Sequence, residues 1–296
     1  MAEVRDRAQL ILVAGLALAV LFVVLALLVN TAIYTENVAT RGVDPGGEAL
    51  EYRGAAVSTV GGLIDAENAD SSHGSVSDVE YALGDGVSEV DESLYRQFAS
   101  RGASTSLDNS SIETTEGVLI RETEVDGFAN WTEGVNQSRA FVVDFDPEEM
   151  PTVNDPQNES FRIDLDDREL YVYVENGNLS VATDDDPEDP ICTTDDWESD
   201  ETIEFDVTAE RFDGEPCRFD WPDPEEITFA NGGNASGTYS LTVDPDDDAS
   251  EVVDDLTDLG VNATEAVYDV RVNLRYDSKD LSYESTVRIA PGEPNE

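Results

Sequence analysis

The hydrophobic residues of the chain are concentrated first in one uninterrupted run near the N-terminus. Residues 10–29 form 20 consecutive positions without a charged or strongly polar side chain. At a rise of about 1.5 Å per residue, a helix of this length spans about 30 Å, the thickness of a bilayer's hydrocarbon core. The pattern predicts a transmembrane helix over residues 10–29. Because Arg5 and Arg7 directly precede it, the positive-inside rule places residues 1–9 in the cytoplasm and the bulk of the chain outside the cell.

Two helical patterns follow, and we expect residues 30–104 to form a helical stalk and hairpin. The first helix is predicted between residues 47 and 68, with an apolar face made by Leu50, Val57, Val60 and Ile64. In the second, an apolar residue recurs every three or four positions, at Val76, Val79, Leu83, Val87, Val90, Leu94 and Phe98. Ser77 and Glu80 stand at the spacing of a capping box near its start.

From about residue 112 the apolar period changes from 3.6 to 2, which indicates strands. Phe141, Val143 and Phe145 alternate in this way, and the Asn176-Gly177 pair between two such runs is typical of a two-residue hairpin turn. We also expect a short helix at 249–259. The predicted fold class is α+β, in which a transmembrane helix and a helical stalk or hairpin precede an antiparallel β-sheet, sandwich-like extracellular domain. This β domain is expected over residues 105–290, with a disordered tail at 291–296.

The balance of charge is extreme and changes the interpretation of the acidic residues. The chain has 67 acidic and 16 basic residues, for a formal net charge of −51. Self-repulsion of this size destabilises a compact chain at low ionic strength, whereas at molar salt the Debye length falls to about 3 Å. The composition therefore indicates an extreme halophile, most simply an archaeal one. It argues against a nucleic-acid partner, because nucleic-acid binding needs a basic surface.

Cysteines and glycosylation sequons agree with an exported chain. Cys192 and Cys217 are the only cysteines, and outside a cell they would form a disulfide; two free thiols are the alternative. Seven of the 15 asparagines begin an Asn-x-Ser/Thr sequon, where about two are expected by chance. These candidate glycosylation sites are Asn109, Asn130, Asn136, Asn158, Asn178, Asn234 and Asn262.

The residues before the apolar run carry a resemblance. Arg7-Ala8-Gln9, followed by an unbroken apolar segment, resembles the class III signal of archaeal type IV pilins and archaellins. The resemblance implies cleavage between Ala8 and Gln9, and it implies that the 10–29 helix forms the core of a filament. Bacterial-type pilins carry a glutamate at the fifth mature position, where this chain has Val13. The resemblance covers about the first 40 residues, which are also similar to a group of uncharacterised haloarchaeal membrane proteins.

Two other fates of the N-terminus remain open at this stage. The segment would be a plain signal anchor if it is never cut. It would be a secretory signal if Ala17-Leu18-Ala19 is a cleavage site, although its apolar run exceeds the 7–15 residues of a signal core.

The sequence contains no recognisable catalytic motif. We therefore expect that the protein is not an enzyme and that it has neither a cofactor nor a metal site. The single histidine, His73, lies in a predicted turn between helices without an evident catalytic partner. Asp244, Asp246 and Asp248 have the 1, 3, 5 spacing of an EF-hand loop, with Asp255 at the twelfth position. Ala249, however, stands where that loop requires glycine, so a solvated acidic loop is the preferred interpretation.

The sequence therefore predicts a membrane-anchored, surface-exposed, N-glycosylated, pilin-like structural protein of an extreme halophile. Its expected location is the cell membrane, as a single-pass protein with a cytoplasmic N-terminus and an extracellular main part. Expected partners are the lipid bilayer, other pilin-like subunits and the pilus or secretion machinery. The alternative is an unprocessed single-pass membrane protein with an extracellular binding domain.

Overall fold

Two antiparallel sheets and the helices that cover them make up the described part of the chain. A computed structural model describes residues 45–122, 135–166, 168–195, 197–198, 201–222, 224, 226–245 and 247–293. The predicted transmembrane helix at 10–29 and the processing residues Arg7, Ala8 and Gln9 lie outside the described residues. Among the described residues, no helix is both long enough and apolar enough to cross a membrane.

The larger sheet has eight strands in the order β13-β12-β1-β11-β2-β7-β8-β9, and the smaller has five in the order β10-β3-β4-β5-β6. The strands of the larger sheet are β1 (Ser104–Glu122), β2 (Val135–Phe145), β7 (Ile203–Asp206), β8 (Arg211–Phe212), β9 (Glu215–Pro216), β11 (Gly237–Pro245), β12 (Ala263–Asp277) and β13 (Ser282–Ile289). Those of the smaller sheet are β3 (Phe161–Leu165), β4 (Arg168–Glu175), β5 (Asn178–Thr183), β6 (Cys192–Thr194) and β10 (Ile227–Ala230). The helices are α2 (Pro45–Ala69), α3 (Val76–Ala99), α4 (Pro156–Glu159), α5 (Ala249–Asp258) and the 3₁₀ turn η1 (Gly232–Asn234).

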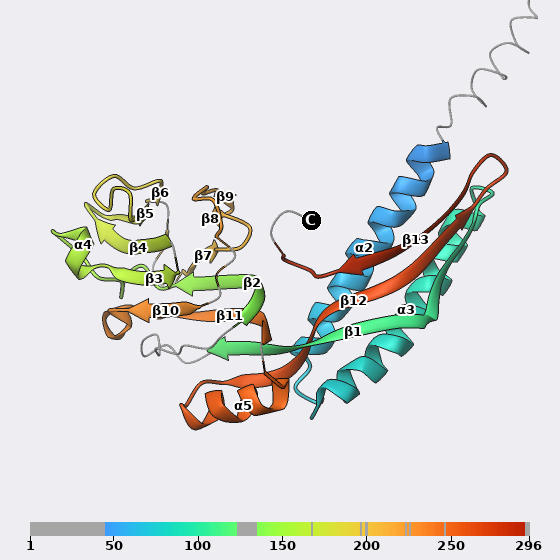
Figure 1. The fold of residues 1–296 in the computed structure, drawn as a ribbon. Coiled ribbons are helices and arrows are strands. Elements are labelled where there is room, and N and C mark those ends of the chain that lie inside the picture. The colour runs from blue at the N-terminus through green and yellow to red at the C-terminus, as the bar shows by residue number, and fades with distance from the viewer. Residues whose placement is uncertain are drawn as a thin grey trace, which may run out of the picture.

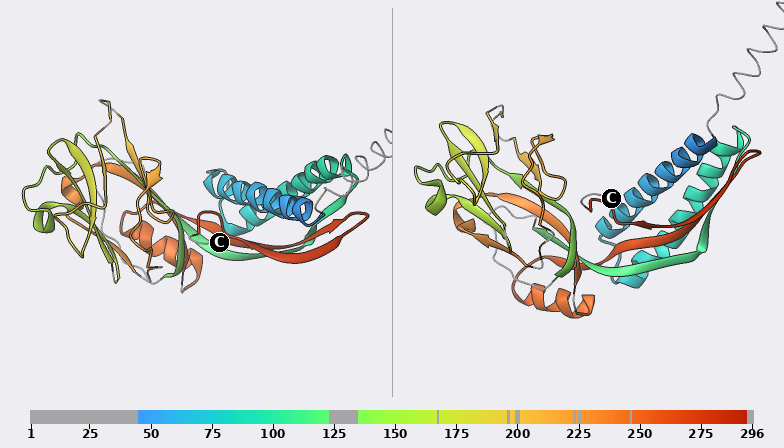
Figure 2. Two further views of the ribbon diagram at one scale, coloured as in Figure 1. Left: turned by 90° about the horizontal axis from the view of Figure 1, so that it is seen from above. Right: turned by 45° about the horizontal axis from the view of Figure 1, so that its top comes forward.

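The predicted fold class was wrong in its architecture. We expected a transmembrane helix and a helical stalk ahead of a separate β domain, but the described chain is mostly antiparallel sheet, and α2 and α3 lie directly on it (Figure 1). Both views of Figure 2 show these helices along one end of the larger sheet, over β1, β12 and β13. An apolar stripe must be buried, but its period does not say against what. Here the stripes are buried against strands that lie more than 200 residues away in the sequence, as where Tyr52 meets Tyr276.

The first of two hydrophobic cores lies between these helices and the sheet. Valines and leucines of α3 meet Val270, Val272 and Leu274 of β12 in this core. The predicted stripe of α3 is confirmed, with Val90 only partly buried. The predicted face of α2 was partly wrong, because Leu50 is 68% exposed. Tyr52 is buried instead and packs against Phe98 and Tyr276, with ring centroids 5.4 and 6.1 Å away. The aromatic contact therefore fixes the rotation of α2.

The second core fills the sandwich between the larger and the smaller sheet. Aromatic rings cross between the sheets here: Phe145 of β2 meets Phe161 of β3 at 5.8 Å, and Tyr239 of β11 meets Phe229 of β10 at 5.2 Å. One side of α5 also belongs to this core. The predicted Asn176-Gly177 hairpin is confirmed between β4 and β5, with φ of 55° and 86° as a type I′ turn requires. The predicted short helix at 249–259 is confirmed as α5.

The long strands β1 and β12 run through both cores and join them (Figure 1). Their pairing shifts register twice, and one shift lies where Thr115 faces Asp269 and Glu116 faces Val267, so that Tyr268 has no opposite residue. The buried Asn68, near the end of α2, holds this bulge. Its amide donates to the carbonyl of Val267 at 2.9 Å and accepts the Val267 N–H at 2.8 Å. The end of α2 is thereby fixed to the sheet.

A buried arginine also lies at this junction. Arg139 of β2 is fully buried and donates to the carbonyls of Tyr268 at 2.8 Å, Val267 at 3.2 Å and Pro291 at 2.6 Å. It also pairs with Asp65 of α2 at 3.1 Å, and its guanidinium lies over the Tyr268 ring. Arg139 therefore connects α2, β2, β12 and the C-terminal segment in one hydrogen-bonded unit.

Candidate functional site

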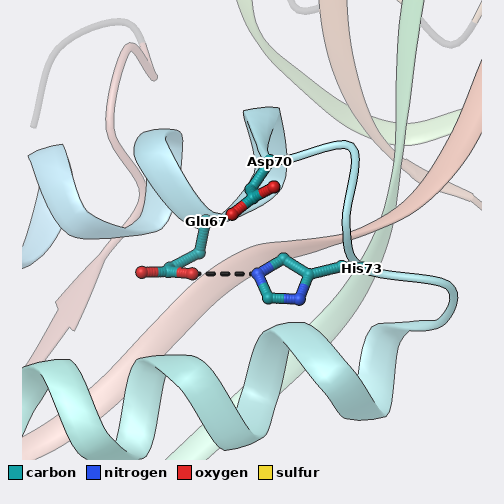
Figure 3. Close-up of side chains that lie close together, drawn as sticks. All are labelled: Glu67, Asp70 and His73. Atoms are coloured by element: carbon teal, nitrogen blue, oxygen red, sulfur yellow. Dashed lines mark hydrogen bonds and ion pairs between the residues drawn. The ribbon is translucent and has the colours of Figure 1, made fainter.

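The turn between α2 and α3 brings three potential metal ligands together. One ligand atom from each of Glu67, Asp70 and His73 lies within 4.8 Å of the others, and Figure 3 shows the three side chains around the turn. His73 Nε2 and Glu67 Oε2 are 2.9 Å apart. The turn position of His73 was expected, but its side chain is only 17% exposed, since it packs beside Glu67.

Local hydrogen bonds explain this conformation. The Asp70 carboxylate accepts the N–H of Ser72 at 2.9 Å, and this bond, with that of the Ser72 hydroxyl, lowers the pKa of Asp70 below its ordinary value. Asp78 then accepts the Gly74 N–H and the Ser75 hydroxyl, each at 3.1 Å. The start of α3 therefore rests on Ser75 and Asp78, two residues earlier than the predicted Ser77 and Glu80 pair.

A distant carboxylate completes this helix start. Glu265 of β12 accepts the N–H of Val76 at 2.8 Å. A negative charge at a helix N-terminus is favourable, because the first N–H groups of a helix have no partner within it.

The distance between His73 and Glu67 fits a hydrogen-bonded pair better than two ligands of one metal ion. Two ligands of one tetrahedral zinc ion stand about 3.4 Å apart, since each lies about 2.1 Å from the metal. His73 and Glu67 are closer than that and share a hydrogen bond. Asp70 already accepts the Ser72 N–H. The cluster therefore closes the α2–α3 turn as it stands.

The predicted disulfide is confirmed. Cys192 and Cys217 are bonded, with their Cα atoms 5.6 Å apart. Cys192 begins β6, the edge strand of the smaller sheet, and Cys217 directly follows β9, the edge strand of the larger one. Beside the bond, the Thr194 hydroxyl donates to Asp213 at 2.7 Å. The disulfide therefore cross-links the two sheets at the edge where their strands are shortest.

The candidate glycosylation sites are spread over the described chain. Asn109 lies in β1, Asn158 in α4 and Asn262 before β12, all three exposed, and Asn178 at the start of β5 is half-buried. Asn136 lies in β2 and Asn234 in η1, without a described side chain, and Asn130 falls outside the described residues.

The acidic loop with EF-hand spacing has another role at its end. Asp248 is the N-cap of α5, and its carboxylate accepts the N–H of Ser250 at 3.1 Å and the Ser250 hydroxyl at 2.6 Å. Both bonds lower the pKa of Asp248 below its ordinary value, and the bond from the Ser250 hydroxyl has the larger effect. Asp246 lies outside the described residues.

A second group of charged side chains was missed by sequence reasoning. Arg288 of β13 pairs with Asp269 at 2.7 Å and with Glu293 at 2.6 Å, and Glu293 also accepts the Tyr268 hydroxyl at 3.0 Å. These bonds raise the pKa of Arg288. The only available signals were that basic residues are few beside the acidic ones in this chain and that Arg288 alternates with the apolar Val287 and Ile289. A groove of about 700 Å³ lies beside the group, between α2 and β13.

The comparisons with known proteins give one match. A family of unknown function, DUF7261, matches residues 4–141, which include α2, α3, β1 and Arg139. The match leaves out β12, β13 and the whole smaller sheet. Neither the curated proteins nor the solved structures include a match to the chain.

Proposed function

We propose that this chain is an exported, glycosylated surface protein of an extreme halophile, held at the cell membrane by its apolar N-terminal sequence and matured as a pilin-like structural subunit. The disulfide between Cys192 and Cys217 is the observation that carries the proposal. Disulfides form and persist in oxidising compartments such as the cell exterior, and they are rare where cellular thiols keep cysteines reduced. Both cysteines lie far along the chain from the apolar segment, in the part that the proposal places outside.

The negative charge of the chain supports the part of the proposal that places it in a hypersaline exterior. With 67 acidic residues and a net charge of −51, the folded chain needs strong screening of its carboxylates. Exposed side chains such as Glu51 and Asp185 carry this charge over both the helical layer and the sandwich.

The position at which helix α2 begins supports attachment of the protein to the membrane through its N-terminal side. Helix α2 begins at the end of the helical layer that lies away from the sandwich, near the turn between β12 and β13, and the chain enters the helix there (Figure 1). The hydrogen bond from Tyr276 to Glu48 at 2.9 Å and the ion pair of Arg101 with Glu51 at 2.7 Å hold this end together. A protein attached there would present its sandwich away from the membrane. Its partners would be the lipid bilayer, further pilin-like subunits and the machinery that exports or assembles them.

The native N-terminus tests the pilin-like element. We expect intact-mass and N-terminal peptide analysis of protein purified from its own cells to give a chain that begins at Gln9. A variant with Ala8→Asp, which places a charged residue at the proposed cleavage position, should retain residues 1–8. The matched control Ala2→Asp leaves the proposed cleavage position unchanged and should be processed normally.

A native chain that begins at Met1 or Ala2 would contradict pilin-type processing. It would favour the alternative, an unprocessed membrane-attached protein with an extracellular binding domain. A chain that begins after Ala19 would contradict both, because only the second half of the apolar segment would remain, which is too short to span a bilayer.

A further inference from the structure

We propose that Asn262 is the sequon at which the folded chain is N-glycosylated, an inference that rests on the proposed export. The side-chain nitrogen Nδ2 of Asn262 would form a bond to the anomeric carbon of an activated glycosyl phosphate. The bond between that carbon and the phosphate oxygen would break, the phosphate would leave with the electron pair, and the amide would lose one proton. No oxidant or reductant is needed.

The sequon itself sets the structural requirement. Because the motif demands a hydroxyl two residues after the asparagine, the modifying enzyme must reach both the amide and that hydroxyl. A glycan is bulky and belongs on the protein surface. In a folded substrate, a usable sequon must therefore expose its asparagine and leave its hydroxyl free of other hydrogen bonds.

Asn262 meets both conditions. Asn262 and Thr264 are exposed, and neither side chain makes a hydrogen bond to another described residue. The backbone around them is well held: Gly260 adopts φ of 86° at the end of α5, and the Val261 N–H donates to Leu256 at 2.9 Å. The Arg121 N–H donates to the carbonyl of Asn262 at 2.8 Å. The amide side chain is thus presented from a fixed loop.

The sequons of Asn158 and Asn178 do not meet the second condition, because the hydroxyl two residues after each asparagine is buried. Ser160, the third residue of the first sequon, is 2% exposed and donates its hydroxyl to the carbonyl of Pro156. The Asn158 amide also donates to Asp155 at 2.9 Å. Ser180, the third residue of the second sequon, is 3% exposed in the middle of β5. Neither hydroxyl can be reached without opening the local fold.

Asn109 is exposed but already bonded. Its amide donates to the Ser88 hydroxyl of α3 at 2.7 Å. The hydroxyl of Ser111 donates to the carbonyl of Asp108 at 2.6 Å and accepts the N–H of Asn273 at 3.0 Å. The Asn109 amide is therefore bonded to α3, and the Ser111 hydroxyl is bonded to β12 at the register shift between β1 and β12.

The sequons of Asn136 and Asn234 also end in buried serines. Ser138 is fully buried in β2, and Ser236 is 4% exposed. Among sequons with both side chains described, only that of Asn262 exposes its asparagine together with a hydroxyl that makes no hydrogen bond.

Site-by-site mass spectrometry of glycopeptides from the native protein tests this selection. We expect glycan on Asn262 and unmodified asparagine at 109, 158 and 178. Thr264→Ala should remove the glycan although Asn262 is retained, whereas Thr264→Ser should keep it. Asn158→Gln is the matched control, and it should change the intact mass by the substitution alone. All four positions are judged by the same digest of the same preparation.

Equal glycan occupancy at Asn158, Asn178 and Asn262 would overturn the proposal, because modification would then precede folding; the proposed surface function would still stand. A native protein without glycan at Asn262 would also overturn it. Export would then be judged separately, by surface labelling of intact cells.

Discussion

Arg139→Met is expected to lower the free energy of unfolding by about 2–4 kcal/mol, because buried backbone carbonyls would be left without their hydrogen-bond donor. Arg139 is fully buried, and burial lowers the pKa of its guanidinium while Asp65 acts in the opposite sense. Methionine keeps much of the apolar volume but donates no hydrogen bond. The carbonyls of Tyr268 and Pro291 would then lose this donor, at about 1–3 kcal/mol for each group left unsatisfied. The carbonyl of Val267 would keep its bond from the Asn68 amide.

Urea unfolding at constant molar potassium chloride, followed by tryptophan fluorescence, measures this loss. Arg271→Met is the matched control, since Arg271 is exposed on β12 and the change removes the same charge. The control should stay within about 0.5 kcal/mol of the unmodified protein. A loss below about 1 kcal/mol for Arg139→Met would show that the junction does not depend on this arginine.

Removing the disulfide is expected to cost about 3–4 kcal/mol. The bond closes a loop across a sequence separation of 25 residues, and in the chain-entropy model such a loop raises the free energy of the unfolded state by this amount. Cys217 is fully buried, so the double variant Cys192→Ala, Cys217→Ala avoids placing a new polar group in the core.

Reductant provides the internal control for this experiment. Full reduction of the unmodified protein should shift its urea midpoint to nearly that of the double variant, which reductant should leave unchanged. If complete reduction left the midpoint of the unmodified protein where it was, the disulfide would not hold the two sheet edges together.

Local patterns allowed part of the fold to be predicted from the sequence. The stripe of α3 and the short helix α5 follow from a period of 3.6, and the Asn176-Gly177 turn follows from the positive φ that its two residues accept. The disulfide follows from having only two cysteines. Each of these depends on residues close in sequence or on a very small number of alternatives.

Long-range packing explains what could not be predicted. Tyr52 is buried and Leu50 is exposed because two aromatic rings, Phe98 and Tyr276, lie on one side of α2. The N–H of Val76 is bonded by Glu265, which is 189 residues away in the sequence. Arg139 is buried because backbone carbonyls from a bulge in another strand surround it.

For the candidate sites, too, local features could be predicted from the sequence, whereas features that depend on packing could not. The sequons could be listed from their motif, but their difference in access depends on burial of the serine or threonine two positions later. The turn position of His73 could be predicted, whereas its bond to Glu67 depends on how α2 ends and the chain turns back.

The central claim is that the described part of the chain lies outside the cell, and a single lysine allows a direct test. Lys279 is the only lysine, and it is exposed in the turn between β12 and β13. Intact cells would be treated with a membrane-impermeant amine reagent at their growth salinity, and the peptide that contains Lys279 would be measured by mass spectrometry. The account predicts that Lys279 is labelled on intact cells as fully as in lysed cells. Labelling of Lys279 only after lysis would contradict it.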